Sequence, residues 1–224
     1  APLTAITNTS LLLQGTDAGI IDKAQGVKSV KLVGDTKSST TQSKYLTSSM
    51  YFDGANDTIS FDNNEGLGSY AGDFTIEMWV YPTAAGSSNV SYLYYQGPSA
   101  ANYTPILIGQ GSGTYNFVYY ATTTGSSWNI ASGVSIGAGA QNTWSHIAVV
   151  REGTNLKTYI DGALGTTTSI GTAALAAASS TGTWLASGNY QHTYYSGYMS
   201  DFRLTKGLAR YTANFTAPTA ALQG

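Results

Sequence analysis

Residues 144–162 read WSHIAVVREGTNLKTYIDG and carry the clearest hairpin pattern in the chain. Bulky side chains alternate along the first half of this stretch, which is the period-two pattern of a β-strand. One face of that strand is expected to carry Trp144, His146, Ala148 and Val150. Residues 152–155, Glu-Gly-Thr-Asn, supply a tight turn into a second strand over Leu156–Ile160. Asp161-Gly162 marks the next reversal, so the sequence predicts an antiparallel hairpin.

A second strong strand pattern covers Asp73–Pro82. Alternation places apolar side chains on one face, namely Phe74, Ile76, Met78 and Val80. The opposite face receives Thr75, Glu77, Trp79 and Tyr81. Because both faces carry large side chains, we expect a central strand. One of its faces should be covered, and the other should border a concave surface.

Shorter apolar or alternating runs, separated by turn residues, recur along the rest of the chain. The further strands predicted from them are Ser10–Leu13, Val27–Val33, Ser49–Phe52, Thr58–Phe61, Ser91–Gln96, Tyr115–Ala121, Thr183–Ser187 and Tyr198–Leu204. Leu208–Tyr211 is expected to make one helical turn. The pattern predicts an all-β, antiparallel two-sheet sandwich in one domain, residues 9–215. Residues 1–8 are expected to form an N-terminal arm and residues 216–224 a C-terminal tail.

Composition excludes several classes of protein. The chain has 224 residues, no cysteine, and 10% charged residues against about 25% in an ordinary domain. The lack of cysteine removes disulfide frameworks, thiolate zinc sites and cysteine nucleophiles. A net charge of −2 without a cluster of Lys or Arg argues against nucleic-acid binding, which depends on counterion release. No apolar run is long enough to cross a bilayer, and the first residues lack the pattern of a secretory signal.

The chain also contains a series of segments whose order and spacing are distinctive. They are Ser49–Gly54 with Asp57, Asp73–Pro82, Trp144–Arg151, Tyr159–Gly162 and Gly197–Leu204. Together they resemble the core strands of laminin-G-like domains in the concanavalin A-like lectin/glucanase superfamily. The resemblance extends from about Leu11 to Pro218 and implies a concanavalin A-like jelly roll.

The closing segment, residues 201–218, reads DFRLTKGLARYTANFTAP. It is similar to the endings of laminin-G-like domains in tailed-phage virion proteins and in some marine and cyanobacterial surface proteins. This likeness implies a non-catalytic virion structural protein that decorates or cements a bacteriophage capsid or forms part of a fibre. It would be made in the host cytoplasm, sit on the virion surface as a homo-oligomer, and contact other virion proteins and cell-surface glycans. The alternative is a carbohydrate-binding adhesin module of a cell-surface or secreted protein.

The superfamily includes glucanases, whose activity depends on paired carboxylates. Retaining glycosidases need two carboxyl groups about 5–5.5 Å apart. The strand that resembles their catalytic strand has Glu77, followed by Trp79 and Tyr81 where further acids would be required. Residues 133–137 spell G-x-S-x-G, but the motif needs a strand-to-helix elbow and these residues are expected in a Gly/Ser-rich loop. We therefore expect no enzymatic activity.

The resemblance also implies one structural calcium ion near the edge of the sandwich. Carboxylates and main-chain carbonyl groups are the ligands that calcium prefers. At the corresponding motif positions the acids are Asp201 on the closing strand and Asp17 or Asp22 in the first loop. Asp53 and Asp57 are a competing pair, although Asp53 and Asp161 each precede a glycine, where Asp commonly makes a turn.

Tyrosine is abundant, with 17 residues, and one concentration suggests a binding loop. Its aromatic residues are Trp184, Tyr190, His192, Tyr194, Tyr195 and Tyr198. Such rings stack on sugar faces and their polar tips bond to hydroxyl groups, so this cluster is a candidate for glycan or partner binding; packing across the sheet is the alternative. A second patch, expected to be structural, draws on Tyr92, Tyr94 and Tyr95 or on Tyr119, Tyr120 and Trp128. His146 is expected to be a packed, hydrogen-bonded core residue.

Overall fold

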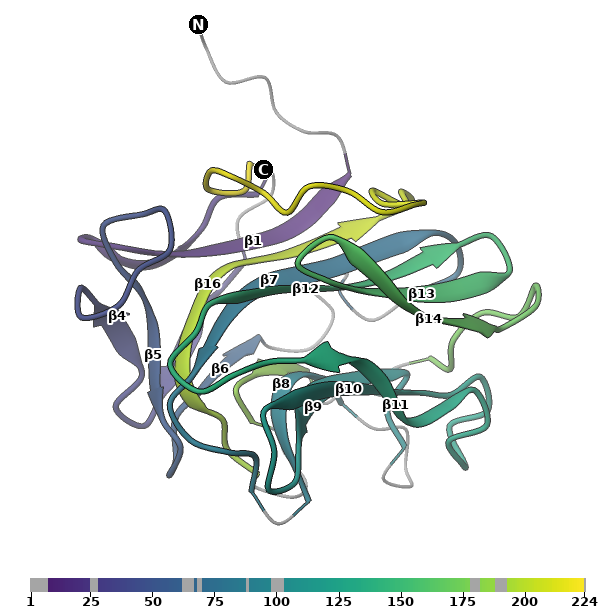
Figure 1. Ribbon diagram of the computed structural model, residues 1–224, viewed down its shortest axis with the longest axis horizontal. Coiled ribbons are helices and arrows are strands. Elements are labelled where there is room, and N and C mark those ends of the chain that lie inside the picture. Colours follow the sequence, from purple (N-terminus) through teal and green to yellow (C-terminus); the bar gives the residue numbers. More distant parts are fainter. Residues whose placement is uncertain are drawn as a thin grey trace, which may run out of the picture.

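The computed structural model describes residues 8–24, 28–61, 67, 70–87, 89–97, 103–177, 182–187 and 193–223. Within these residues the chain forms two antiparallel β-sheets that pack face to face, and no helix is present (Figure 1). The described residues therefore contain no helix that could cross a membrane. The predicted all-β sandwich is confirmed.

The first sheet has nine strands, with the order β14-β13-β12-β7-β16-β1-β2, and β5 and β4 extend it from β16. Its strands are β1 Thr9–Thr16, β2 Gly19–Asp22, β4 Lys37–Ser39, β5 Ser49–Asp53, β7 Phe74–Pro82, β12 Ser145–Glu152, β13 Asn155–Ile160, β14 Ala163–Ser169 and β16 Ser196–Lys206. The predicted hairpin is β12–β13, closed by pairing of Glu152 with Asn155. The predicted central strand is β7, which lies between β12 and β16.

The second sheet has seven strands in the order β11-β10-β9-β8-β15-β6-β3. They are β3 Lys31–Val33, β6 Thr58–Phe61, β8 Val90–Gln96, β9 Ile106–Gly111, β10 Asn116–Ala121, β11 Ala131–Ala138 and β15 Thr183–Leu185. β6 has the predicted bounds, whereas of the predicted strand Val27–Val33 only β3 forms, and Val27 lies outside the described residues.

The core lies between the two sheets and contains the apolar face predicted for β7. Phe74, Ile76, Met78 and Val80 are all fully buried there. They pack in one cluster with the inward residues of the facing sheet, which include Ile59, Phe61, Leu93, Tyr94, Ile106, Ile108, Phe117 and Tyr119. Burial of this apolar surface is the main favourable contribution to folding, at roughly 25 cal/mol for each Å² removed from water.

Five strands were not expected from the sequence: β2, β4, β9, β11 and β14. β11 corrects the interpretation of residues 133–137 as a loop, because their backbone pairs with β10. Gly, Ser and Ala make up most of β11, so apolar alternation is absent. Its glycines permit a close approach instead: a Cβ atom at Gly137 would lie 2.5 Å from Ile160 Cγ2 on the opposite sheet.

The outer face of the nine-stranded sheet is covered by the C-terminal segment, residues 207–223, which crosses β16 and β1 (Figure 1, yellow). Tyr211 and Phe215 stack at 3.6 Å between ring centroids and pack against Tyr159, together with Ala148 and Val150. The expectation that this face of β7 borders an open concave surface was therefore wrong. The cover was not foreseen because residues 212–223 form neither strand nor helix and have no regular apolar pattern.

The helical turn expected at Leu208–Tyr211 was also wrong, since this stretch has no regular structure. Its polar backbone groups bond to a side chain of the sheet instead. The Thr75 hydroxyl donates to the carbonyl oxygen of Leu208 (3.1 Å) and accepts from the backbone N–H of Arg210 (2.9 Å). These bonds satisfy the groups that a helical turn would have used.

A buried carboxylate, that of Glu77, fastens this segment to the sheet. Arg203 on β16 donates through Nε and Nη2 to Glu77 Oε1, at 2.9 and 2.7 Å. The Tyr211 hydroxyl donates to Oε2 at 2.7 Å, and His146 Nε2 lies 3.1 Å from the same oxygen. Burial raises the pKa of Glu77, but the hydrogen bond with His146 and the charge of Arg203 outweigh burial and hold the pKa at about 2. The stabilisation is complete above about pH 4.5 and is lost as the pH falls toward 2.

The prediction that His146 is a packed, hydrogen-bonded core residue is confirmed by this network. Its side chain is fully buried, and its ring lies 5.2 Å from that of Trp79 and 5.8 Å from that of Phe215. Four separate parts of the chain, β7, β12, β16 and the C-terminal segment, therefore meet at one carboxylate.

Replacing Glu77 with Gln should lower the free energy of unfolding by about 3–5 kcal/mol, because the buried Arg203 guanidinium would lose its carboxylate partner. Urea unfolding at pH 7 measures the change. Glu152→Gln is the matched control, since Glu152 pairs with Lys157 near the surface and exposed ion pairs contribute little. Equal losses in both variants would contradict the role given to Glu77.

Candidate functional site

The six aromatic residues predicted to form a binding cluster do not share one surface. Trp184 is half-buried on β15 of the seven-stranded sheet, whereas Tyr195 is fully buried in the core, 6.3 Å from Phe52. Tyr198 lies on the outer face of the nine-stranded sheet, with its ring 5.0 Å from that of Tyr51. The reason is topological: β15 and β16 follow each other in sequence but belong to different sheets.

The remaining members of the cluster complete this picture. Tyr194 is half-buried, and Tyr190 and His192 lie outside the described residues. Of the four that the structure describes, Trp184 reaches the aromatic surface described next. The binding role given to the others stays a prediction.

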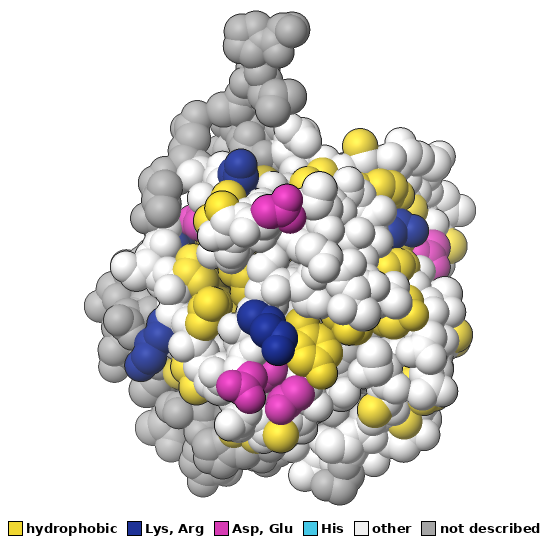
Figure 2. Space-filling view, turned by 90° about the vertical axis from the view of Figure 1, so that its left-hand side faces the viewer, with side chains coloured by type: hydrophobic (Ala, Val, Ile, Leu, Met, Phe, Trp, Pro, Cys, Tyr) yellow, Lys and Arg dark blue, Asp and Glu magenta, His cyan; other side chains and the backbone are white. Residues whose placement is uncertain are grey.

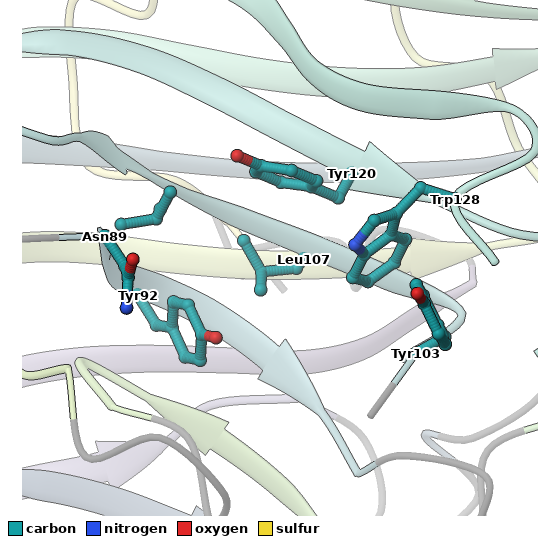
Figure 3. A pocket seen from close by; sticks show the side chains of 7 residues that line it. Asn89, Tyr92, Tyr103, Leu107, Tyr120 and Trp128 are labelled. Carbon is teal, nitrogen blue, oxygen red and sulfur yellow. The ribbon is translucent and has the colours of Figure 1, made fainter. Parts of the chain in front are cut away.

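A pocket with a volume of about 340 Å³ opens on the outer face of the seven-stranded sheet, the face turned away from the other sheet (Figure 3). It is lined by Asn89, Val90, Tyr92, Tyr103, Leu107, Tyr120 and Trp128. Leu107 forms the floor, and the aromatic rings stand around it in Figure 3. Tyr92, Tyr120 and Trp128 belong to the second patch, which was expected to be structural, whereas Tyr103 and Leu107 were not predicted.

A β-bulge decides which tyrosines of β8 reach this face. The pairing of β8 with β9 shifts register between Tyr92 and Tyr94. As a result Leu93 and Tyr94 both point into the core, while Tyr92 and Tyr95 both point outward and stack with their ring centroids 5.3 Å apart. Bulges commonly re-aim side chains in this way near binding sites.

The outward residues of four adjacent strands form a single row across the sheet. Tyr120 on β10 pairs with Leu107 on β9, and Leu107 pairs with Tyr95 on β8. Tyr95 in turn pairs with Trp184 on β15, and these two rings lie 5.8 Å apart. Tyr120 and Trp184 are half-buried, whereas Leu107 and Tyr95 are almost completely buried and form the base of the row.

Trp128 is held at one end of the pocket by the loop between β10 and β11. The side-chain carbonyl of Asn129 accepts hydrogen bonds from Thr122 Oγ1 (2.8 Å) and the Thr123 backbone N–H (3.0 Å). With the loop fixed in this way, the indole ring lies 5.2 Å from the rings of both Tyr103 and Tyr120. The pocket is therefore bounded by rings whose positions are set before any ligand arrives.

The chemistry available in the pocket is stacking and hydrogen bonding. None of its seven lining residues is charged. Burial raises the pKa of Tyr92, one of these lining residues, so its hydroxyl group stays protonated at neutral pH. No carboxylate lines the pocket, so its lining contains no pair of the kind that glycosidases use.

Two of the chain's three glutamates, and the serine motif, lie elsewhere. Glu77 is engaged beneath the C-terminal segment, and Glu152 pairs with Lys157. Glu65 lies outside the described residues. Ser135 of the G-x-S-x-G sequence sits within β11, where the following residues continue the strand and no helix follows.

The three acids predicted to hold calcium do not converge. Asp22 accepts backbone N–H groups from Leu12, Ala24 and Lys28 with both of its oxygens. Asp201 accepts from Gln14 Nε2 at 2.7 Å. Asp17 is exposed and accepts from the Thr47 hydroxyl.

The competing pair is engaged by the backbone as well. Asp57 accepts from the backbone N–H groups of Asp35 and Asp53, and Asp53 makes the expected turn by accepting from Ala55. Across the part of the chain that the structure describes, no three His, Cys, Asp or Glu residues are grouped to hold a metal. These residues do not fit a calcium site, and bound calcium stays a prediction.

A two-sheet sandwich with a ring-lined, uncharged pocket on one outer face defines a lectin-like class of protein. A family model described as the concanavalin A-like lectin/glucanases superfamily, of laminin-G type, matches residues 53–208. The chain belongs to this superfamily, as the sequence resemblance implied. A comparison with curated proteins gave no match.

Solved structures agree on the fold. The binding domain of Paraclostridial Mosquitocidal Protein 1 is similar with a TM-score of 0.67 and 14% identity over 89% of this chain. The binding domain of Botulinum Neurotoxin DC, in complex with SialylT, is similar with a TM-score of 0.65 and 14% identity over 90% of this chain. This chain spans 49% of each of these domains.

A third structure matches almost end to end. It is Domain 4 of an extracellular arabinanase from Geobacillus stearothermophilus, in complex with arabinotriose. The TM-score is 0.64 with 12% identity, over 90% of this chain and 94% of that one. Likenesses at such low identity establish the fold, and function has to be argued from the site.

Asp201 should give the protein a measurable pH dependence. Burial raises the pKa of Asp201 to about 6, although the hydrogen bond from Gln14 lowers this pKa in part. The folded state thus keeps the proton up to about pH 6, whereas the unfolded state releases it near pH 3.8, so ionisation destabilises the fold as the pH rises through this window. Between pH 4 and pH 8, native protein should lose about 2.5 kcal/mol of stability relative to Asp201→Asn. Urea unfolding of both proteins across this pH range checks the result. If the free energy of unfolding changed with pH in the same way for the native protein and for Asp201→Asn, the prediction would be contradicted.

Proposed function

We propose that this protein is a non-catalytic carbohydrate-binding protein whose ligand sits in the pocket on the outer face of the seven-stranded sheet. The observation that carries the proposal is the pocket itself, with Tyr92, Tyr103, Tyr120 and Trp128 around a floor of Leu107. Binding pockets are typically concave and lined by apolar and aromatic side chains with a few polar groups that fix orientation. This pocket has that composition.

Sugars suit such a lining for a physical reason. One face of a sugar ring carries C–H groups that pack against an aromatic ring, while its hydroxyl groups need hydrogen-bond partners. Tyrosine and tryptophan supply both, and they lose little conformational entropy because only two side-chain torsions are fixed. The Asn89 side chain adds an amide that can donate and accept at the rim.

The similar structures support this proposal. The arabinanase Domain 4 was solved with arabinotriose, and one of the toxin binding domains with SialylT. Because both share this fold, they favour a carbohydrate ligand for this chain. Their sequence identity is too low to indicate which sugar it binds.

Trp128→Ala should weaken glycan binding about tenfold or more, since one wall of the pocket and its stacking surface would be lost. Glycan-array screening followed by titration calorimetry on the strongest binder measures the effect. Trp144→Ala removes the same half-buried side chain next to β12 of the other sheet and serves as the matched control. The proposed site is wrong if both variants bind like the native protein.

For the setting in which the site is displayed, we propose a virion surface, with a cell-surface or secreted adhesin as the alternative. Support comes from the resemblance of residues 201–218 to virion proteins. The sheet edges add to it, because the edge strands β3 and β14 expose Leu32, Val33 and Leu164. Unpaired edge strands with apolar side chains are suited to pairing with another chain.

A stable dimer or trimer is therefore expected at micromolar concentration. Size-exclusion chromatography with light scattering measures it, with calcium and with a chelator added in parallel runs. Leu164→Lys and Leu32→Lys should each be tested, because a charge on the responsible edge strand should dissociate the assembly. A monomer under all conditions would overturn the proposed oligomer.

A further inference from the structure

We infer that the pocket selects an uncharged, extended oligosaccharide that lies across the strands of the seven-stranded sheet, from Trp128 toward Trp184. This inference deepens the proposed function and rests on it. It specifies two properties of the ligand: the absence of charge, and a length greater than a single sugar.

The first property follows from where the charges are. The chain has no Asp, Glu, Lys or Arg in residues 78–150 or in residues 162–200. These two stretches contain β8, β9, β10, β11 and β15, which are five of the seven strands of the sheet. Both the outer face of these strands and every loop that joins them within the two stretches lack a charged side chain.

In the other sheet, seven of the nine strands contain at least one charged residue. Figure 2 looks onto the side where β4 and β5 lie, and there acidic and basic side chains stand among the hydrophobic ones. In that region Lys37 lies over the Tyr51 ring and Lys44 over the Trp79 ring. The uncharged face is therefore a local feature of the seven-stranded sheet.

An acidic sugar would bind poorly on such a face. Its carboxylate would leave water for a pocket walled by rings, where no Lys or Arg side chain could pair with it. Tyrosine hydroxyl groups offer hydrogen bonds but no compensating charge. A neutral sugar avoids this cost and keeps both the stacking and the hydrogen bonds.

The second property follows from the row Tyr120, Leu107, Tyr95 and Trp184. Each step in the row is one strand spacing, so the distance from β10 to β15 is roughly 14 Å for three steps of about 4.8 Å. The half-buried rings at the two ends, Tyr120 and Trp184, flank a buried base. A single sugar would meet one end, whereas a short chain laid across the strands would meet both.

The row also shows where the uncharged surface ends. Beyond Trp184 the pairing continues to Ser60 on β6 and then to Lys31 on β3. Lys31 is exposed and lies two strand spacings, roughly 10 Å, past Trp184. The uncharged part of the row thus runs from Tyr120 to Ser60.

The test uses a glycan array that holds neutral linear oligosaccharides, the same backbones carrying a terminal sialic acid, and chains containing uronic acids. Neutral chains should bind. The affinity for each acidic counterpart should be at least about tenfold lower. Affinity for the best neutral chain should change less than about twofold between roughly 50 and 500 mM NaCl, because no ion pair is screened.

Chain length is tested on the same neutral ligand in a series from the monosaccharide upward. Affinity should rise with length and then level off. Trp184→Ala should remove the gain from length, and Trp128→Ala should weaken every member of the series. Trp144→Ala is the control, and circular dichroism confirms that each variant is folded.

The outcomes separate this inference from the function on which it rests. Tight, salt-sensitive binding of acidic glycans would overturn the inference and leave carbohydrate binding standing. Affinity that does not depend on chain length, or on Trp184, would also overturn it. An array without any glycan bound by the native protein would overturn the proposed function itself.

Discussion

Glu77 places a carboxylate at the centre of the nine-stranded sheet, where burial alone would make its charge unfavourable. Arg203, His146 and Tyr211 compensate for the lost hydration, and each comes from a different part of the chain. Because a buried charge is costly unless all of its partners are in place, the network requires β7, β12, β16 and the C-terminal segment to meet in one arrangement. The position of the C-terminal segment, and so the cover on that face, depends on this constraint.

That cover makes the two outer faces of the sandwich unlike each other. Tyr211, Phe215 and Leu222 occupy much of the face that the nine-stranded sheet would otherwise expose. Along the described residues, the seven-stranded sheet instead carries the ring-lined pocket on its outer face. Aromatic side chains thus serve as internal packing on one face and as a lining for a ligand on the other. Composition alone does not distinguish these two uses of tyrosine.

The sequence predicted the fold better than the site, for physical reasons. β7, β12 and β13 have clear period-two alternation because one face of each packs in the core, whereas β11 and β14 lie at sheet edges and are built from small polar residues. The site depends on the bulge in β8: strict alternation would put Tyr92 and Tyr94 on one face, but the bulge puts Tyr92 and Tyr95 there. The row then gains Trp184 from a strand far along the sequence, which no local pattern indicates.

The low charge of the chain acquires a meaning once it is placed on the structure. A content of 10% charged residues spread evenly would leave a few charges on each sheet, yet six of the seven strands of one sheet have none. Solubility does not require this, since exposed Lys or Glu on the outer face would favour it. Stability does not require it either, because a charge that remains solvated at a surface costs little. Recognition of a neutral, hydroxyl-rich chain does account for it, because a fixed charge beside the rings would hold water that such a ligand must displace.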